Sequence, residues 1–352
     1  MKKIPEHGGN YNFFNKEIRY DFSINVNPLR FPEKLKDKLL EKIDDIEKYP
    51  EIYSESFIKK VSEFYNCSEN NFIAGNGSIQ LIYLIPSALK LKEAVVVVPN
   101  FSEYEKSLKL YNINLNFFYL KENEEFALDV DKFMKIYRKK SIDAIFITNP
   151  SNPCANLIEY EKLLKIAEYC RKNNIFLIID EAFIDFTEAK SLIFKNFKGL
   201  IIIRSFTKNF AIAGLRLGII KSDKNTVQTL KRFLPPWSVN SLSIEAGKIL
   251  IENYDFLLKT RSYVKKEREY LKKELLKIKN LKIFHSDVNY FLIKILNNLS
   301  AFQLTNILLD RGILIRDCSN FRGLNEKFFR ICVKNREENK VLIESLKEIF
   351  IN

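Results

Sequence analysis

Glycine and proline are both scarce in this chain, with ten of each among 352 residues. Such low contents argue against a disordered or fibrous protein. Long apolar runs are absent too: no stretch approaches the roughly 20 residues that a membrane helix needs, and residues 1–7 turn polar at once. We therefore expect a folded chain with neither a signal segment nor a membrane anchor. Its length suits one large domain and a smaller companion.

Paired cysteines and histidines are also missing. The five cysteines form no C-x-x-C pair, and an odd number cannot all pair. Together with the polar start, this pattern predicts a protein of the reducing cytoplasm. The two histidines, His7 and His285, lie far apart in sequence, so we expect no zinc-type site and no other metal.

The net charge of +13 suggests nucleic acid as a partner, but the distribution of the charges argues against it. Lysines recur beside acids, as in KLKDK at residues 34–38 and KKERE at residues 265–269. Mixed runs of this kind are typical of solvated helix surfaces and not of a stripe that follows phosphates. A positive field of this size could still attract an anionic small substrate.

Four short apolar runs rich in β-branched residues predict strands that are buried on both faces. They span residues 94–98, 144–148, 175–179 and 200–203. Between the second and third, residues 160–173 carry apolar side chains at helical spacing. This order predicts an α/β fold with a mainly parallel sheet and right-handed crossovers. Ligands bind at the carboxyl ends of such strands, so we expect chemistry in the polar residues that follow them.

The last third of the chain has a different pattern. Residues 241–279 predict one or two long charged helices, and a terminal helix begins at Glu337. Alternating runs predict strands at residues 281–285, 290–295, 313–316 and 328–333. That composition is typical of an antiparallel α+β domain. We therefore predict a large domain over residues 48–240 and a smaller α+β domain built from residues 1–47 and 241–352.

Lys208 comes shortly after the run at 200–203, among small residues and hydroxyls. Burial there would lower the pKa of its amine and make it a nucleophile towards an aldehyde. Ser205, Thr207 and Arg216 offer two hydroxyls and a guanidinium to a phosphate dianion. The alternative is an ordinary loop at the end of a strand, with a lysine that faces solvent.

Asp180 lies at the end of another predicted buried strand, where a carboxylate needs a partner. The protonated ring nitrogen of a pyridine cofactor would be such a partner. A metal held by Asp180 and Glu181 is the competing interpretation. In the turn NPSNP at 149–153, the prolines hold Asn152 in an extended geometry that could present its amide to a phenolate oxygen, although such a sequence can be merely a turn.

A glycine-rich turn, AGNGS at residues 74–78, precedes a predicted helix over residues 79–89. Such a turn presents free N–H groups to an anion. It lacks the lysine of a Walker A loop and the third glycine of a dinucleotide fingerprint. Beside the Lys208 segment, Gly77 and Ser78 would supply the other half of a phosphate cup.

In this order, the features resemble the pyridoxal-5′-phosphate (PLP) enzymes of fold type I, which are related to aspartate and histidinol-phosphate aminotransferases. The openings HGGN at 7–10 and DFSINVNPL at 21–29 are similar to those of the L-threonine-O-3-phosphate decarboxylases of cobalamin biosynthesis. Later segments match the same family: DEAFIDF at 180–186, PWSVN at 236–240, VNY at 288–290, and IRDCSNF at 315–321 with Arg330. Histidinol-phosphate aminotransferases usually lack HGGN and carry tyrosine at the position of Phe183.

The resemblance implies roles for particular residues. Lys208 would bind PLP as an imine, Asp180 would pair with the pyridine nitrogen, and Asn152 would reach the phenolic oxygen. Phe101 would stack on the ring. The cofactor phosphate would be held by Gly77, Ser78, Ser205, Thr207 and Arg216, and by Tyr49 from a neighbouring subunit, which implies a homodimer. Arg330 would bind the substrate carboxylate, and the substrate phosphate region would involve His7, Gly9, Asn10, Asn27 and Arg316.

The implied activity is decarboxylation of O-phospho-L-threonine to (R)-1-amino-2-propanol O-2-phosphate for the nucleotide-loop linker of cobalamin. A histidinol-phosphate-type aminotransferase, a decarboxylase preferring O-phospho-L-serine and a non-catalytic PLP or nucleic-acid binder are the alternatives. Cys154-Ala155 departs from the usual Thr-Gly, so the local backbone there is open. For the terminal residues the simpler alternatives are a helix cap at His7 and Asn10 and surface ion pairs at Arg316 and Arg330.

Overall fold

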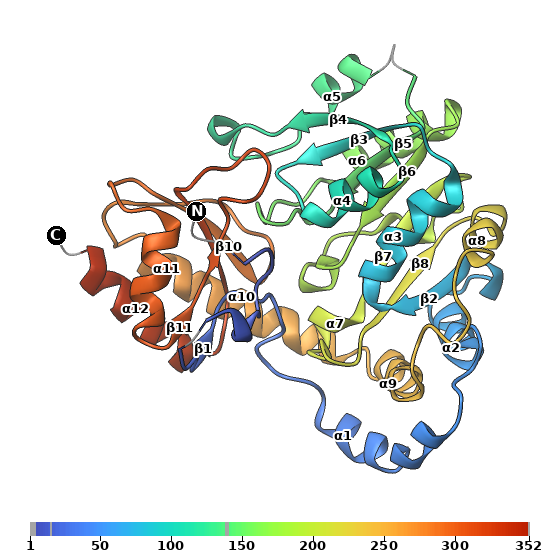
Figure 1. The fold of residues 1–352 in the computed structure, drawn as a ribbon, viewed down its shortest axis with the longest axis horizontal. Coiled ribbons are helices and arrows are strands. Elements are labelled where there is room, and N and C mark those ends of the chain that lie inside the picture. The colour runs from blue at the N-terminus through green and yellow to red at the C-terminus, as the bar shows by residue number, and fades with distance from the viewer. Residues whose placement is uncertain (1–4, 15, 138–140, 351–352) are drawn as a thin grey trace.

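The computed structural model describes residues 5–14, 16–137 and 141–350. Its larger part is built on a seven-stranded sheet with the order β2-β8-β7-β6-β5-β3-β4 (Figure 1). Only β8 runs against its neighbours, so the predicted mainly parallel sheet is present. The strands are β2 (Phe72–Asn76), β3 (Glu93–Val98), β4 (Asn114–Tyr119), β5 (Ala144–Thr148), β6 (Phe176–Asp180), β7 (Leu200–Ser205) and β8 (Leu217–Lys221).

Helices cover both faces of this sheet, which explains why its central strands are apolar throughout. Ile145 and Ile147 of β5 pack into one core cluster with Ile166 of α6, while Phe146 faces a second cluster with Leu81 of α3. The helices of this part are α1 (Glu33–Leu40), α2 (Glu55–Tyr65), α3 (Gly77–Leu89), α4 (Ser102–Leu110), α5 (Val130–Tyr137), α6 (Tyr160–Lys172), α7 (Phe206–Asn209), α8 (Lys224–Lys231) and α9 (Ser241–Glu252).

The smaller part contains an antiparallel sheet with the order β12-β13-β10-β9, as its alternating pattern predicts. Its strands are β9 (Leu281–Ile283), β10 (Tyr290–Ile295), β12 (Arg316–Asp317) and β13 (Phe328–Cys332), and its helices are α10 (Phe256–Leu275), α11 (Ala301–Leu309) and α12 (Arg336–Phe350). The single strand expected at 313–316 is instead two, because β11 (Ile313–Leu314) pairs in parallel with β1 (Tyr20–Asp21) and only β12 joins the antiparallel sheet.

Helix α10 connects the two parts. Its first turn contributes Leu257 to the core of the large sheet, and its last turns contribute Leu271 and Leu275 to the core of the small part. The preceding helix α9 packs against α2 of the large part, although it lies beyond the predicted boundary at residue 240. The division at 48–240 thus stays a prediction, and the packing favours a boundary between α9 and α10.

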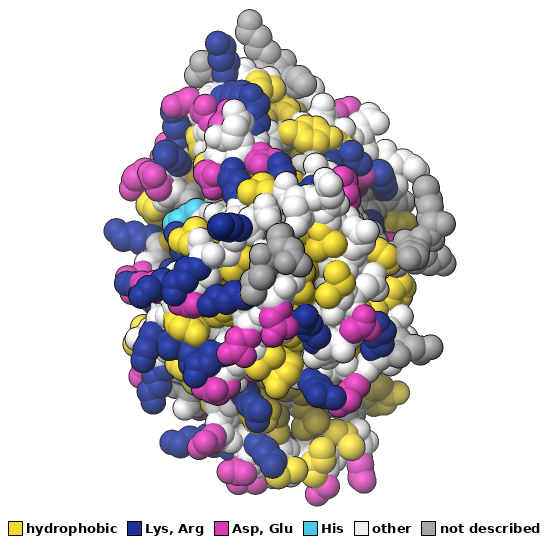
Figure 2. Space-filling view, turned by 90° about the vertical axis from the view of Figure 1, so that its left-hand side faces the viewer, with side chains coloured by type: hydrophobic (Ala, Val, Ile, Leu, Met, Phe, Trp, Pro, Cys, Tyr) yellow, Lys and Arg dark blue, Asp and Glu magenta, His cyan; other side chains and the backbone are white. Residues whose placement is uncertain are grey.

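Two surface properties bear on partners. On the face shown in Figure 2, lysines and arginines are interspersed with aspartates and glutamates, as the mixed runs predict. In the described part of the chain, no helix is both long enough and apolar enough to cross a membrane. All five cysteines are free thiols, and four of them are buried.

Candidate functional site

A cleft of about 300 Å³ opens at the carboxyl ends of the parallel strands, where the large sheet meets the small part. It is lined from both parts and from the N-terminal segment. The sequence-predicted residues in its wall are His7, Ser78, Phe101, Asn152, Asp180, Ser205, Thr207, Lys208, Arg216, Arg316 and Arg330. Lys208 and Asp180 therefore line one cleft and do not lie in separate ones.

Lys208 lies on α7, a single turn that follows β7 directly. Its amine makes no hydrogen bond or ion pair with any described residue, and burial together with the positive charges of Arg216 and Arg330 lowers its pKa to about 8. Near physiological pH roughly a fifth of such an amine is neutral, far more than for an ordinary lysine. It therefore has the property that a nucleophile towards an aldehyde requires.

Asp180 ends β6, and it is 5 % exposed. Burial raises the pKa of its carboxyl, although Tyr104 donates a hydrogen bond to one oxygen and the Ala182 N–H donates to the other at 2.9 Å. No lysine or arginine of the described residues forms an ion pair with it. Two hydrogen-bond donors hold the carboxylate in place, but among the described residues no cation offsets the free-energy cost of burying its charge.

The predicted phosphate cup forms where β2 ends beside the start of its antiparallel neighbour β8. The Gly77 N–H donates to the Arg216 carbonyl at 3.0 Å, and the Arg216 guanidinium lies over Gly77, where an added Cβ would be 2.4 Å from Nη2. Gly77 also has a φ of +73°, a region that favours glycine. Gly77 is the first residue of α3 and Ser78 is the second, and the hydroxyls of Ser205 and Thr207 share a 2.7 Å hydrogen bond in the cleft wall. The start of α3, the Arg216 guanidinium and the two hydroxyls thus offer hydrogen-bond donors to an anion, as helix N-termini commonly do.

Arg316 and Arg330 are direct partners on the antiparallel strands β12 and β13. Directly opposite residues share a face of the sheet, so the two guanidinium groups are neighbours. Both are buried, at 5 % and 6 % exposure, and neither forms an ion pair with a described carboxylate. Buried like charges repel, which makes this face of the cleft a place for an anionic ligand.

The two arginines are also held by polar contacts. Arg330 donates to the Asn152 side chain and, at 2.9 Å, to the Ser23 carbonyl, while its Nε has no partner among the described residues. Arg316 donates to the carbonyls of Pro5 and Glu6 and so fixes the N-terminal segment at the cleft. These bonds rule out the alternative that both arginines are surface ion pairs.

His7 lies at the rim, 3.0 Å from Glu103 and with its ring centroid 5.6 Å from that of Phe101. Glu6, His7 and Glu103 bring three possible metal ligands together. Lys106 occupies this cluster, however, at 2.6 Å from Glu6 and 2.9 Å from Glu103. The ammonium group supplies the positive charge that a metal would otherwise bring.

Asn25 and Glu103 in the cleft wall, and Tyr104 buried behind it, were not singled out from the sequence. Tyr104, the donor to Asp180, lies within a helix whose pattern shows only an apolar position. Asn25 lines the cleft and is 3 % exposed, and its Oδ1 has no hydrogen-bond partner in the described structure. Glu103 orients His7. Only Asn25 carried a usable signal, because it belongs to the quoted segment DFSINVNPL.

Other predicted residues lie outside the cleft wall. Asn27 is buried and bonds to protein atoms at 2.7–2.9 Å. Gly9 and Asn10 line a separate small cavity, where the Gly9 N–H donates to the Ser23 hydroxyl. Asn10 precedes a 3₁₀ turn without a side-chain capping bond. Tyr49 is 83 % exposed and contacts Trp237, so within one chain it reaches no part of the cleft.

Glu181 does not form a paired-acid site with Asp180. It is fully buried, lies 3.0 Å from Arg204 and accepts a 2.6 Å hydrogen bond from Ser191. Arg204 also bonds to Asp185 at 2.8 Å. Because an arginine already neutralises these acids, the competing interpretation of a metal at Asp180 and Glu181 receives no support.

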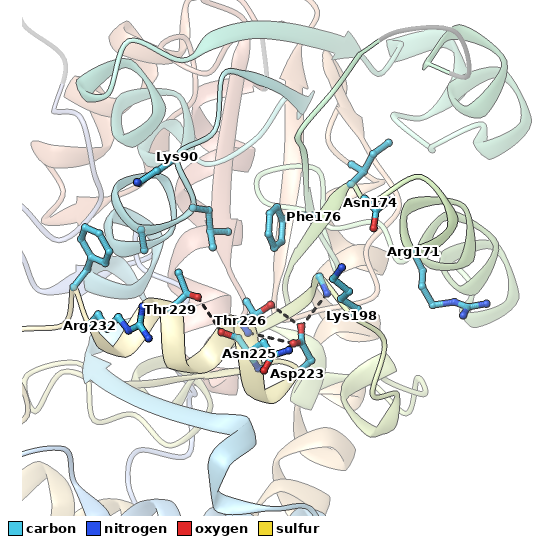
Figure 3. Close-up of a pocket in the computed structure, with 15 residues that line it drawn as sticks. Lys90, Arg171, Asn174, Phe176, Lys198, Asp223, Asn225, Thr226, Thr229 and Arg232 are labelled. Carbon is cyan, nitrogen blue, oxygen red and sulfur yellow. Dashed lines mark hydrogen bonds between the residues drawn. The ribbon is translucent and has the colours of Figure 1, made fainter.

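A larger hollow of about 950 Å³ lies at the opposite end of β6, near Phe176 (Figure 3). Lys90, Arg171, Lys198 and Arg232 surround it, but in this view they spread around its margin and do not point at a common centre. The Asp223 carboxylate is used by Gly199, Asn225 and Thr226. This hollow lacks the convergent polar groups of the cleft at Lys208.

Two curated proteins are similar to this chain over nearly its whole length. The adenosylcobalamin biosynthesis bifunctional protein CobDQ of Leptospira interrogans is 34% identical over 99% of this chain, which spans 41% of that longer protein. A protein of Caldanaerobacter subterraneus subsp. tengcongensis, provisionally named a threonine-phosphate decarboxylase, is 36% identical over 99% of this chain and 95% of its own length.

Solved structures agree. The histidinol-phosphate aminotransferase of Clostridium acetobutylicum has a TM-score of 0.87 at 30% identity and covers 95% of this chain and 99% of its own. The L-threonine-O-3-phosphate decarboxylase of Porphyromonas gingivalis has a TM-score of 0.84 at 25% identity, over 94% of this chain and 99% of its own. The predicted fold and the resemblance to this family are confirmed. Since the model of aminotransferase class I and II matches residues 18–346, the chain belongs to that enzyme family.

Proposed function

We propose that this enzyme binds PLP at Lys208 and decarboxylates O-phospho-L-threonine to (R)-1-amino-2-propanol O-2-phosphate, the linker precursor of the cobalamin nucleotide loop. One observation carries the proposal. Counting only the described residues, the cleft brings together four cations without a carboxylate partner and one buried carboxylate without a cation. The cations are Lys208, Arg216, Arg316 and Arg330, and the carboxylate is Asp180. A cofactor and a substrate that bring anionic groups to the four cations and a cationic group to Asp180 would supply the missing partners.

The residues fit PLP in particular. The uncompensated Asp180 suits the protonated pyridine nitrogen, and Lys208 offers a free amine to the aldehyde. The cup of Gly77, Ser78, Ser205, Thr207 and Arg216 would take the cofactor phosphate, because a guanidinium, hydroxyls and a helix N-terminus all favour a dianion. Asn152 would hold the phenolic oxygen, and Phe101 would cover the ring.

Once bound, PLP supplies an electron sink for the pair left at the substrate Cα when a bond there breaks. The protein decides which bond that is by orienting the substrate. Arg330, which lines the cleft and whose buried Nε has no partner among the described residues, would bind the carboxylate. The amine of Lys208, whose pKa burial lowers to about 8, would hold a proton for Cα.

The second arginine favours a substrate with two anionic groups. Arg316 neighbours Arg330 across the strand pair, and His7 lies at the rim beside them. A phosphate there would add charge-assisted hydrogen bonds to the carboxylate contact of Arg330. Asn25, with its unpartnered Oδ1 at the cleft, would contribute a further polar contact to the substrate.

Histidinol-phosphate-type amino transfer is the second candidate, because a solved enzyme of that name shares the fold at 30% identity, against 25% for the solved decarboxylase. Phe183, which packs at 5.0 Å against Tyr290, and the HGGN opening favour the decarboxylase. A preference for O-phospho-L-serine would require the pocket to reject one methyl group, a difference of about 1–3 kcal/mol.

We further propose a homodimer that works in a reducing cytoplasm. Tyr49 points away from its own cleft and is 83 % exposed, as a residue that serves a neighbouring subunit would be. The five thiols are all unpaired.

The direct test incubates the purified protein with PLP and O-phospho-L-threonine and measures released CO₂. Decarboxylation of O-phospho-L-threonine, absent in Lys208→Ala, is the expected result. Amino transfer to a 2-oxo acid without CO₂ would instead establish the aminotransferase, and parallel assays with O-phospho-L-serine rank the substrates.

A further inference from the structure

Asn27 makes an unusual set of contacts for a residue beside a cleft that it does not line. Its backbone N–H donates to the Lys208 carbonyl at 3.0 Å, and its side-chain Nδ2 donates to the Asn209 carbonyl at 2.7 Å. The same Nδ2 donates to the Thr260 hydroxyl at 2.8 Å. Every one of these groups is buried or, in the case of Lys208, half-buried.

These contacts matter because α7 is so short. It is a four-residue helix, and Lys208 and Asn209 are its last two residues. The last carbonyls of any helix lack partners within the helix, and one isolated turn is not stable by itself. Asn27 donates to both final carbonyls, of which that of Lys208 also accepts from the Ala211 N–H at 3.3 Å, and so holds the turn that carries the amine.

Asn27 is itself rigid. Its Oδ1 accepts a 2.9 Å hydrogen bond from the Leu29 N–H, which closes an Asx turn over Pro28. The following proline also confines Asn27 to extended backbone. Because the Asn27 side chain is itself held in place, its hydrogen bond can restrain the position of the Asn209 carbonyl.

The residue after Lys208 is held from a second side. The Asn209 side chain donates to Asp185 at 2.6 Å, and Asp185 also pairs with Arg204 and accepts from Tyr254 at 2.6 Å. Thr260, the third partner of Asn27, lies on α10, which connects the two parts of the molecule. Asn27 therefore joins the Lys208 turn to the helix at their junction.

We propose that Asn27 is a positioning residue that clamps the Lys208 turn to α10 and thereby sets where the amine lies in the cleft, and that it does not contact the substrate phosphate. This assignment deepens the proposed function and rests on Lys208 being the PLP-binding residue. It replaces the substrate role that the family resemblance implied for Asn27.

The test measures two properties of the full-length apoprotein: the rate at which it captures added PLP as a function of pH, and hydrogen exchange of the amides at residues 206–211. Asn27→Leu keeps the approximate size and the backbone N–H that donates to Lys208, but it removes the side-chain donor to Asn209 and Thr260. We expect capture about tenfold slower, since small misplacements of a reacting group are costly. We also expect the midpoint of the pH profile for PLP capture to move above the Lys208 pKa of about 8. Hydrogen exchange should become faster in α7 and nowhere else.

Asn71→Leu is the matched control, because Asn71 is a buried asparagine that donates to the Ser222 carbonyl at 2.8 Å, away from the cleft. It should leave the capture profile and α7 exchange unchanged. Thr260→Val removes only the hydroxyl that accepts from Asn27. It should show the same changes more weakly, and it replaces Asn27→Leu in the test if that variant does not fold.

The outcomes separate the two claims. Equal capture profiles and equal α7 exchange for wild type and the folded variants at 27 and 260 would overturn the clamp. If the wild type itself captures no PLP, the proposed function fails, and the exchange arm alone decides whether Asn27 holds α7.

Discussion

At the residue scale, the site is defined by charges that the protein does not balance. Elsewhere buried charges find partners, as Arg204 does with Glu181 and Asp185. In the cleft, Asp180 lacks a cation and Lys208 lacks any polar partner among the described residues. Burying an unpaired charge costs stability, so these groups are retained for ligands and not for folding.

Lys208→Met should stabilise the apoprotein at pH 7. Because burial lowers the folded-state pKa of the amine to about 8 from 10.5, the folded state binds its proton more weakly than the unfolded state does. The penalty is full below pH 8 and disappears as the pH rises towards 10.5. We expect a gain of up to about 3 kcal/mol at pH 7, reduced by whatever solvent reaches the amine. Urea unfolding at pH 7 and pH 10 measures it, with the exposed Lys90→Met as the control that should change nothing.

Tyr104→Phe should weaken PLP binding without abolishing it. The Tyr104 hydroxyl donates to Asp180 and opposes the rise in that carboxyl's pKa, so its loss leaves Asp180 more often protonated. A lost hydrogen bond to a buried charge corresponds to roughly a tenfold change in affinity. Titration of apoprotein with PLP at several pH values reports it, and an unchanged affinity at every pH would contradict the role of Tyr104.

The sequence revealed the residues whose roles follow from strand ends and missed those that helices or distant segments supply. Lys208 and Asp180 stand directly after apolar runs, so their place was predictable. Tyr104 is one helical position among several, and only folding brings it to Asp180. Asn25 and Asn27 lie two residues apart in the segment DFSINVNPL, and the sequence offers no means to decide which of them faces the cleft.

At the element scale, the interior strands were predictable because burial on both faces leaves a continuous apolar run. β5 has its predicted bounds, and β3, β6 and β7 differ by one or two residues. β2, β4 and β8 were not predicted. β4 lies at one edge and β2 at the other, and their half-exposed or glycine-containing sequences lack the uniform pattern of a doubly covered strand.

Gly218→Ala tests how the start of α3 is seated on β8. An added Cβ at residue 218 would lie 2.5 Å from the Ser78 backbone nitrogen, which cannot yield without moving the helix N-terminus. We expect a loss of about 1–3 kcal/mol in unfolding free energy and a weaker affinity for PLP. Gly214→Ala, where an added Cβ meets no atom within 4 Å, is the control. Normal PLP affinity in Gly218→Ala would show that the phosphate cup tolerates a displaced α3.

At the scale of the whole molecule, an ion pair beside the cleft ties the large part to the small part. Arg322, in the loop after β12, makes a two-point contact with Glu105 of α4 at 2.7 and 2.8 Å. The pairing with Arg322 lowers the pKa of Glu105 to about 2. The cleft lies between the two parts, so this contact bears on how closely they approach.

Glu105→Gln should lower stability at pH 7 by up to about 1 kcal/mol, since Arg322 is substantially exposed and solvent screens the pair. A carboxyl with a lowered folded-state pKa stabilises above its unfolded pKa, near 4.5, and the contribution is lost as the pH falls towards 2. Urea unfolding of both proteins at pH 7 and at pH 3 should therefore show a difference that shrinks with acid. A constant difference would assign the effect to packing.

The central claim is that Lys208 holds PLP in this cleft, and one measurement addresses it most directly. The wild-type protein is incubated with PLP and reduced with borohydride, and its peptides are then mapped by mass spectrometry. The account predicts a single stoichiometric pyridoxyl adduct on Lys208, with loss of the visible absorption band. An adduct spread over surface lysines, or a stoichiometric adduct at any other lysine, would contradict it.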